Sequence, residues 1–470
     1  MYKIILSALA LVVLTGCPGT RQPAPQVLPD LVRAKSQALQ THDGRTYRDL
    51  NHNGTQDPYE DSGQPAETRV ADLLSQMTLE EKAGMMFISG APVSADGKPD
   101  GSEGLTGPAA RMPSVVENMS TRKMNHFNIW SIPDDPQMFA TWYNQVQLLA
   151  EQSRLGIPVT IASDPRHHFS RNIFSVTATG FTQFCETLGL AAIGDEALVR
   201  TFADIVRQEY LATGIREALH PQIDLATEPR WPRINGGFGE DAQLTARMVR
   251  AYIEGMQGPT LGSNSVACMT KHFPGGGPQK EGLDPHFDFQ QGQIYPGDSF
   301  DYHLIPFEAA FEAGTAAIMP YYGIPVGQTD EEVGMAYNKT IITTLLREKY
   351  KFDGIVWKAR AWGVEHLNEA DRVLKIIEAG CDQFGGEIRP ELVVQLVQEG
   401  RLSEARIDES IRRLLRQRFE LGLFDNPFVD ETQTAAIVGK AKFRALGERT
   451  QQEAMTLLKN DAVLPLAPGK

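Results

Sequence analysis

The sequence predicts an α/β fold of the (β/α)8 class, the TIM-type barrel, on three observations. Short apolar runs recur along the chain and each ends in polar or charged residues, as buried parallel strands do. Segments with helical spacing lie between the runs, and strands that alternate with helices indicate a parallel sheet. At least six such units are present, without a GxGxxG or P-loop motif, and this favours a barrel over a doubly wound sheet.

The same patterns place the elements along the chain. Helical spacing covers 70–77, and Thr78 and Glu81 then form a capping box that opens a second helix. The apolar runs expected as strands are 157–163, 219–225, 266–272, 316–322, 354–357 and 379–384. The longer helices are expected at 196–212, 244–257, 364–378 and 407–419, and the last of these ends at Gly422.

The N-terminus has the pattern of an export signal. Lys3 is followed by an apolar run over 4–14, shorter than the about 20 residues of a membrane-spanning helix. The run leads into Leu14-Thr15-Gly16-Cys17, which resembles a bacterial lipoprotein box, where the cysteine is acylated and becomes the new N-terminus. We expect a signal peptide at 1–16 and a membrane anchor of several acyl chains on Cys17. The alternative is a secreted protein in which this cysteine is accidental.

The residues after the anchor indicate where the protein is held. Pro18 stands in place of Asp, which by resemblance to sorted Gram-negative lipoproteins favours the outer membrane, facing the periplasm or the cell surface. We expect 17–45 to be anchor and spacer, since 18–45 are rich in Pro, Gln and Ala. The barrel domain is then expected at 46–455.

Composition narrows the class of protein. Removing 16 residues from 470 leaves 454, and the full sequence has the 41% hydrophobic and 22% charged content of a globular protein. Because the net charge is −14 and no basic cluster is present, nucleic acid is not expected as a partner. The remaining cysteines, Cys185, Cys268 and Cys381, are far apart and indicate buried thiols, with neither a disulfide framework nor a CxxC metal pair.

The segment 49–60 has the spacing of a calcium loop. Oxygen ligands are expected at positions 1, 3, 5, 9 and 12, with Gly54 at the sharp turn. The candidate ligands are Asp49, Asn51, Asn53, Asp57 and Glu60. The alternative is a surface turn rich in Asn and Asp that binds no metal.

Polar side chains follow the expected strands at their carboxyl ends, where barrels carry their chemistry. The candidates are Asp164 after the first run, Arg230 and Arg233 after the second, Lys271 and His272 at the end of the third, and Tyr322 at the end of the fourth. This set suits a neutral ligand rich in hydroxyls, because Asp accepts hydrogen bonds while Lys and Arg donate them. The alternative for Arg230 is a salt bridge on the surface.

Several segments together resemble glycoside hydrolase family 3, the β-glucosidase-like family, over residues 45–466. They are 69–86, Glu228-Pro-Arg-Trp-Pro-Arg233 with Gly239-Glu-Asp, Lys271-His272-Phe273-Pro-Gly-Gly, Phe352-Asp-Gly-Ile-Val356, and Leu457-Leu-Lys-Asn-Asp with Leu464-Pro-Leu466. The resemblance implies a barrel that cleaves the terminal sugar of β-glycosides with retention and needs no cofactor. It implies that Asp164 binds outer sugar hydroxyls and that Arg233, Lys271 and His272 hold those nearer the reaction centre. Tyr322 would orient the nucleophile, and Arg230 matches the family's sugar-binding arginine less well.

The chain departs from that family where the nucleophile is expected. The family carries its nucleophilic Asp in a Ser/Thr-Asp-Trp motif just after the strand, whereas this chain has no carboxylate between Asp353 and Glu365. We expect that this segment has been deleted, that Asp353 lies at the wrong end of the strand, and that Glu365 is displaced. The acid/base Glu of many members comes from a second α/β domain, and 456–470 resembles the start of a linker to it. A possible substitute acid is Asp284.

Three functions therefore remain open from the sequence. The first is a β-glycosidase by descent, acting on terminal sugars of β-glycosides and weakened or inactive in this chain. The second is a non-catalytic envelope lipoprotein that binds oligosaccharides. The third is a metal-dependent hydrolase built from His167, His168, His272 and His286, although no metal-ligand spacing such as HExxH supports it.

Overall fold

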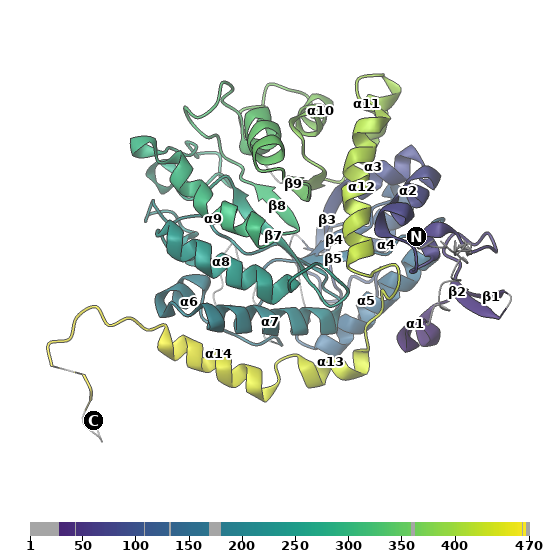
Figure 1. The fold of residues 1–470 in the computed structure, drawn as a ribbon, viewed down its shortest axis with the longest axis horizontal. Helices are drawn as coiled ribbons and strands as arrows, with labels where there is room; N and C mark the ends of the chain where they lie inside the picture. The colour runs from purple at the N-terminus through teal and green to yellow at the C-terminus, as the bar shows by residue number, and fades with distance from the viewer. Residues whose placement is uncertain are drawn as a thin grey trace, which may run out of the picture.

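The computed structural model describes residues 28–42, 44–107, 109–130, 133–168, 180–358, 362–462 and 464–466. In this part of the chain eight parallel strands close into a barrel in the order β10-β3-β4-β5-β6-β7-β8-β9, surrounded by helices (Figure 1). The strands are β3 (Phe87–Ala91), β4 (His126–Ile129), β5 (Thr160–Ser163), β6 (Glu217–Ala218), β7 (Ala267–Phe273), β8 (Ala317–Pro320), β9 (Ile355–Lys358) and β10 (Gln383–Gly385). The predicted (β/α)8 barrel is confirmed.

The helices lie between and around these strands. They are α1 (Asp30–Lys35), α2 (Ala66–Gln76), α3 (Leu79–Met85), α4 (Val115–Arg122), α5 (Pro136–Glu151), α6 (Thr187–Ile193), α7 (Glu196–Thr213), α8 (Ala242–Gln257), α9 (Phe300–Glu312), α10 (Glu369–Ala379), α11 (Pro390–Gln398), α12 (Glu404–Glu420), α13 (Glu431–Ile437) and α14 (Ala441–Glu453). A π-helix covers Thr340–Lys349. Short 3₁₀ turns cover Pro58–Glu60, Ala109–Arg111, Ile234–Gly236, Lys280–Gly282, Pro296–Asp298 and Met335–Tyr337.

Local sequence signals explain several helix boundaries. The predicted capping box opens α3, where the Glu81 amide donates to Thr78 Oγ1 at 3.3 Å and the Thr78 amide donates to Glu81 Oε2 at 2.9 Å. Helix α12 begins after Ser403, whose side chain accepts from the Arg406 amide. Downstream of this helix the chain turns at Gly422, whose φ of 69° lies in the left-handed region that favours glycine.

The expected strand at 219–225 is wrong in its position. The ladder of β6 consists of Glu217 and Ala218 only, and the residues after it make an isolated bridge from Gln222 to Lys271. Pro221 lacks an amide hydrogen, so this segment cannot continue a full ladder of hydrogen bonds. The chain there is extended but serves to carry polar residues across the end of the barrel.

The barrel closes through buried aromatic packing between its last and first strands. The rings of Phe87 on β3 and Phe384 on β10 are stacked with centroids 4.8 Å apart, and both side chains are fully buried. Parallel pairing of Phe384 with Phe87 sets the register at the same position. This closure brings the carboxyl ends of all the strands to one rim.

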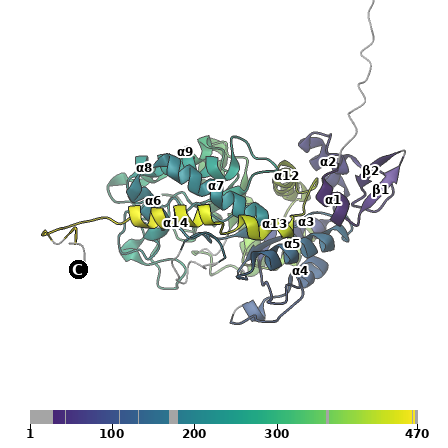
Figure 2. The same cartoon turned by 90° about the horizontal axis from the view of Figure 1, so that it is seen from below.

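The N-terminal segment packs on the outside of the barrel. An antiparallel pair, β1 (Leu39–His42) and β2 (Arg45–Arg48), leads into the barrel helices. Arg48 is tied to α5 by a buried ion pair, with its Nη2 2.5 Å from Glu151 Oε1. On another side, α13 and α14 run along α7 and α6 (Figure 2). None of the described helices is long and apolar enough to cross a membrane.

Candidate active site

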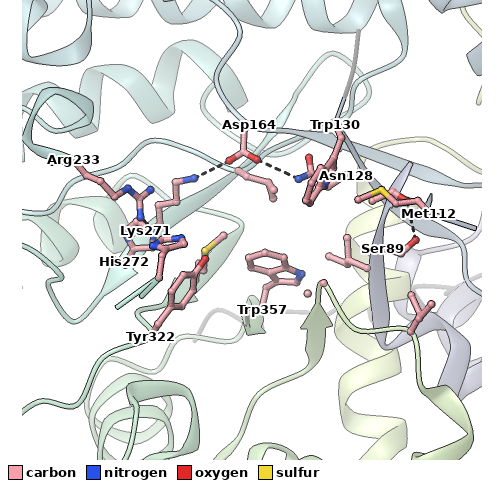
Figure 3. A pocket seen from close by; sticks show the side chains of 18 of the residues that line it. Ser89, Met112, Asn128, Trp130, Asp164, Arg233, Lys271, His272, Tyr322 and Trp357 are labelled. Carbon is pink, nitrogen blue, oxygen red and sulfur yellow. Dashed lines mark hydrogen bonds and ion pairs between the residues drawn. The ribbon is translucent and has the colours of Figure 1, made fainter. Parts of the chain in front are cut away.

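A cavity of about 470 Å³ opens at the carboxyl ends of the strands. Side chains from several strands and the loops after them line it, and Figure 3 shows them converging on one space. The lining residues are Ile88, Ser89, Gly90, Met112, Pro113, Asn128, Trp130, Asp164, Leu219, Arg233, Lys271, His272, His286, Met319, Tyr322, Trp357, Gly385, Gly386 and Ile388. Five of the six sequence-predicted sugar-binding residues, namely Asp164, Arg233, Lys271, His272 and Tyr322, lie together here.

Asp164 stands at the centre of the polar wall. Lys271 Nζ donates to its Oδ1 at 3.0 Å, and Asn128 Nδ2 donates to its Oδ2 at 3.2 Å. Burial by itself raises the pKa of the Asp164 carboxyl, but the charges of Lys271 and Arg166 outweigh that effect and lower the pKa to about 2. The group is therefore an ionised acceptor throughout the neutral range, with about a third of its side chain exposed to the cavity.

His272 is held as a neutral imidazole beside this wall. Its Nδ1 lies 2.7 Å from Asp224 Oδ2, and Arg233 Nη1 lies 3.4 Å from its Nε2. Burial, together with the charges of Arg233 and Lys271, places the pKa of His272 well below its usual value. Because the neutral ring has one donor and one acceptor, Nδ1–H donates to Asp224 and Nε2 accepts from Arg233.

Asp224 supports the ring from behind the cavity. Its Oδ1 accepts from the backbone amides of His272 and Gly276, the first of these at 3.2 Å. Burial raises the pKa of Asp224 to about 6, although these hydrogen bonds and the Arg233 charge act in the opposite direction. Asp224 is thus a fixed positioning group for His272 and does not line the cavity itself.

Asp284 also lies behind the cavity and not in it. Its carboxylate accepts from Trp231 Nε1 at 2.6 Å and Tyr321 OH at 2.9 Å, and contacts His286 Nδ1 at 2.5 Å. Although burial raises the pKa of Asp284, the His286 hydrogen bond and the charge of Arg233 hold it below its usual range. Because the Asp284 carboxylate is ionised and hydrogen-bonded, it has no proton to donate. His286, which Asp284 contacts, is the residue that lines the cavity on this side.

Tyr322 completes this side of the cavity. Its ring meets the His286 ring edge-on at 4.7 Å and stacks on Tyr321 at 5.3 Å. These contacts fix the Tyr322 ring where the sequence places it, at the end of β8. The side chain is 9% exposed and that exposure is toward the cavity.

Arg230 does not join the group. Its guanidinium is 65% exposed and pairs with Glu228, with Nη2 2.7 Å from Oε2. The surface salt bridge, which was the alternative reading of the sequence, is therefore what the structure shows. Arg233, three residues later, turns inward because Gln222 accepts from its Nη2 at 3.4 Å and donates to its carbonyl at 3.1 Å.

The two carboxylates that flank the nucleophile position lie away from the cavity. Asp353 precedes β9 and pairs with Arg413 at 2.9 Å and Arg416 at 2.8 Å, at the opposite end of the barrel. Glu365 is exposed, and its Oε1 accepts from the Gly363 amide. Among the described lining residues Asp164 is the one carboxylic acid; residues 359–361, directly after β9, lie outside the described part of the chain.

Sequence reasoning missed several lining residues, above all Asn128, Trp130 and Trp357. Asn128 belongs to β4, a strand that was not predicted, so its side chain had no assigned strand end. Trp357 lies within an expected strand, but an apolar residue there reads as core. The signal that could have found Asn128 and Trp357 is the barrel itself, since alternate residues of every strand face its interior.

The predicted calcium loop forms, but its side chains bond to the loop. Asp49 accepts from the amides of Asn53 and Gly54, and Glu60 accepts from those of Leu50, Asn51 and Asp57. The side-chain Nδ2 atoms of Asn51 and Asn53 both donate to Asp57 Oδ2. The calcium site stays a prediction, and melting with and without a chelator tests it.

The histidines of the metal-hydrolase hypothesis do not converge. His167 contacts Glu209 at 2.9 Å and His168 contacts the Cys185 carbonyl at 2.7 Å, whereas His272 and His286 belong to the cavity. Across the described residues, no group of three or more His, Cys, Asp or Glu side chains is placed to hold a metal ion. The expected lipidation site, Cys17, lies outside the described residues.

Comparison with known proteins agrees with this geometry. The model of the glycosyl hydrolase family 3 N terminal domain matches residues 130–417. Beta-glucosidase C of Emericella nidulans is 48% identical over 435 residues, which cover 88% of this chain and 68% of that protein. The periplasmic beta-glucosidase/beta-xylosidase of Dickeya chrysanthemi is 44% identical over 464 residues, which cover 92% of this chain and 70% of that protein.

Solved structures show the same fold. A β-glucosidase from Erythrobacter marinus superposes with a TM-score of 0.70 at 26% identity, covering 88% of this chain and 53% of that one. A β-glucosidase from Listeria innocua in complex with glucose also gives 0.70, at 24% identity, covering 85% and 53%. The chain thus spans about two thirds of the two relatives above and about half of these solved chains. On the match over 130–417 and the identity to its relatives, the chain belongs to glycosyl hydrolase family 3.

Proposed function

We propose that the cavity binds the terminal sugar of a β-glycoside. The observation that carries the proposal is the cluster of Asp164, Lys271 and Asn128 at the carboxyl ends of three strands. An ionised carboxylate can accept from two adjacent hydroxyls, while an ammonium donates to a third oxygen. The names of the relatives from Emericella and Dickeya, β-glucosidase and β-xylosidase, point to the same class of ligand.

Arg233, His272 and Tyr322 are the proposed contacts nearer the reaction centre. Arg233 is positive and buried beside the neutral His272 ring, so it can donate to a ligand oxygen. His272 Nε2 can exchange its contact with Arg233 for a ligand hydroxyl, since an acceptor at 3.4 Å is weakly held. Tyr322 is fixed by its aromatic neighbours and lines the same space.

We further propose that this chain is a weakened or inactive β-glycosidase. Retaining hydrolysis needs two carboxyl groups about 5–5.5 Å apart, one as nucleophile and one as acid/base. Asp164 pairs with Lys271, has a pKa of about 2 and keeps about a third of its side chain exposed, so it suits hydroxyl binding. No carboxylate is encoded between Asp353 and Glu365, which favours a deletion of the nucleophile segment. A non-catalytic carbohydrate-binding protein is the second candidate, favoured by the same observation.

Export and anchoring belong to the same proposal. The leader at 1–16 and the box ending in Cys17 favour an outer-membrane lipoprotein, and the Dickeya relative is named periplasmic. A Cys17→Ser variant expressed in a Gram-negative host should lose incorporation of labelled palmitate and leave the membrane fraction. Equal palmitate incorporation by the variant and the parent would contradict the anchor.

Calorimetric titration with methyl β-D-glucoside and turnover of an aryl β-D-glucoside test the function together. We expect the parent chain to bind the sugar and to turn over the aryl glucoside far below ordinary enzyme rates. Asp164→Asn should bind at least about tenfold more weakly, because hydrogen bonds to a charged group are lost. Asp204→Asn, which breaks a surface pair with Arg207, is the matched control and should bind like the parent. Turnover at ordinary rates would refute the missing nucleophile, and absence of binding would refute the sugar site.

A further inference from the structure

The wall across the cavity from Asp164 is formed by Trp357, which none of the contacts above uses. Its side chain is 7% exposed and lines the cavity, and Figure 3 shows the indole projecting between Tyr322 and the Ser89 side. The indole lies against the backbone of Gly385, where an added Cβ would stand 1.9 Å from its Cζ2. A glycine is therefore required at 385, and β10 behind it fixes the ring in place.

Two buried polar atoms of this cavity have no hydrogen-bond partner among the described residues. They are the donor Nε1 of Trp357 and the acceptor Oδ1 of Asn128. The Asn128 amide cannot turn to hide its oxygen without losing the bond from its Nδ2 to Asp164. Buried polar groups in folded proteins are almost always paired, so two orphans in one cavity indicate a missing partner.

We infer that Trp357 and Asn128 are ligand contacts that set the specificity of this cavity, an inference that rests on the proposed sugar site. One ligand hydroxyl accepts from Trp357 Nε1 and another donates to Asn128 Oδ1. A hydroxyl can do both, whereas a carboxylate or phosphate has no proton to give Asn128. The ligand class is therefore a neutral ring with several hydroxyls, and an apolar C–H face of that ring packs on the indole.

The cavity has a polar side and a largely apolar side. Asn128, Asp164 and Lys271 come from β4, the end of β5 and β7 and form the polar side, and Met319, Trp357 and Ile88 come from β8, β9 and β3 and form the largely apolar side. A pyranose has hydroxyls at its edge and C–H groups on its faces. Trp357 gives the apolar side one polar contact, which fixes how the ring is turned.

Calorimetric titration of Trp357→Phe with methyl β-D-glucoside tests the role of the indole. Phe keeps an aromatic face but removes the N–H, so we expect binding about 2- to 10-fold weaker than the parent, the loss of one hydrogen bond between neutral groups. The matched control is Trp142→Phe on α5, a fully buried tryptophan whose Nε1 also has no described partner but which lies outside the cavity. It should bind like the parent.

Deoxy analogues of methyl β-D-glucoside separate a ligand contact from a packing effect. One deoxy analogue should bind the parent more weakly than the full sugar does, because its missing hydroxyl is the partner of Trp357 Nε1. Trp357→Phe should bind this analogue and the full sugar with the same affinity. Gly385→Ala is a second variant, for use if Trp357→Phe folds poorly. It places a methyl where the indole lies and should therefore weaken binding too. Binding by Trp357→Phe within twofold of the parent would overturn the inference. Absence of binding by the parent would instead overturn the proposed sugar site, and this inference with it.

Discussion

Glu217, inside the barrel, offers a prediction whose size follows from the structure. The side chain lies on β6 with no exposed surface, and neither carboxyl oxygen has a hydrogen-bond partner among the described residues. His126 Nε2 stands 3.6 Å away, and burial lowers the pKa of that ring, so it supplies no positive charge. Burial raises the pKa of Glu217 from 4.5 to about 7, although the charge of Arg418 acts in the opposite direction.

The sign of the pH dependence follows from that rise. Between pH 4.5 and about 7 the folded protein holds a proton on Glu217 that the unfolded chain has released, so the free energy of unfolding falls as pH increases through this window. Multiplying the rise of about 2.5 in pKa by 1.36 kcal/mol gives about 3 kcal/mol lost by pH 8. Glu217→Gln replaces the carboxyl with a neutral group of the same shape and removes this loss.

Urea unfolding of the parent and of Glu217→Gln across pH 4.5 to 8 measures the effect. We expect similar stability at the acid end and a variant more stable by up to about 3 kcal/mol at pH 8. Asp224, whose pKa burial raises to about 6, contributes equally to both proteins and cancels. Glu254→Gln, in a surface pair with Arg200, should show no such trend. A stability difference that stays constant with pH would refute the reasoning.

Three more predictions concern binding and stability. Lys271→Met should raise the pKa of Asp164 above about 2 and weaken binding of methyl β-D-glucoside at least about tenfold, measured by NMR titration and calorimetry; an unchanged pKa would contradict the pairing. Arg48→Met leaves the Glu151 carboxylate buried without its partner and should lower the free energy of unfolding by about 3–5 kcal/mol in urea. Asp353→Asn should leave sugar affinity unchanged, because this side chain lies at the other end of the barrel; a loss of binding or of residual turnover would show that Asp353 acts at the cavity.

The sequence predicts the barrel because several of its strands are short apolar runs that end in polar residues. The runs that became β7 and β8 are short, largely apolar and followed by polar residues, so their positions agree with the prediction, although the helix between them, α9, was not predicted. Strands β3 and β4 were missed for different reasons. Phe87 follows directly on the apolar end of α3 and reads as its continuation, while β4 is only four residues long and contains His126 and Asn128.

The residues of the candidate site could likewise be predicted from the sequence only in part. Polar residues that follow an apolar run can be recognised in the sequence, and five of the six sugar contacts proposed in this way lie in the cavity. The resemblance already made Arg230 the weaker candidate, and the fold separates the two arginines, since Gln222 bonds to Arg233 whereas Arg230 pairs with Glu228 at the surface. Trp357 could not be chosen from an apolar strand, because its role depends on the missing side chain of Gly385 on the neighbouring strand.

The geometry makes sugar binding and bond cleavage separable in this fold. The polar side of the cavity comes from β4, β5 and β7, where Asn128, Asp164 and Lys271 hold one another in place. The bonds among these three side chains involve no residue of β9 or of the segment that follows it, and β9 itself pairs with β8 and β10. A change confined to that segment can therefore remove an attacking group and leave both the closed barrel and the hydroxyl-binding wall. In this chain Trp357 stands on β9 and lines the same cavity, so under the proposed function the strand that precedes the nucleophile position would supply a binding surface.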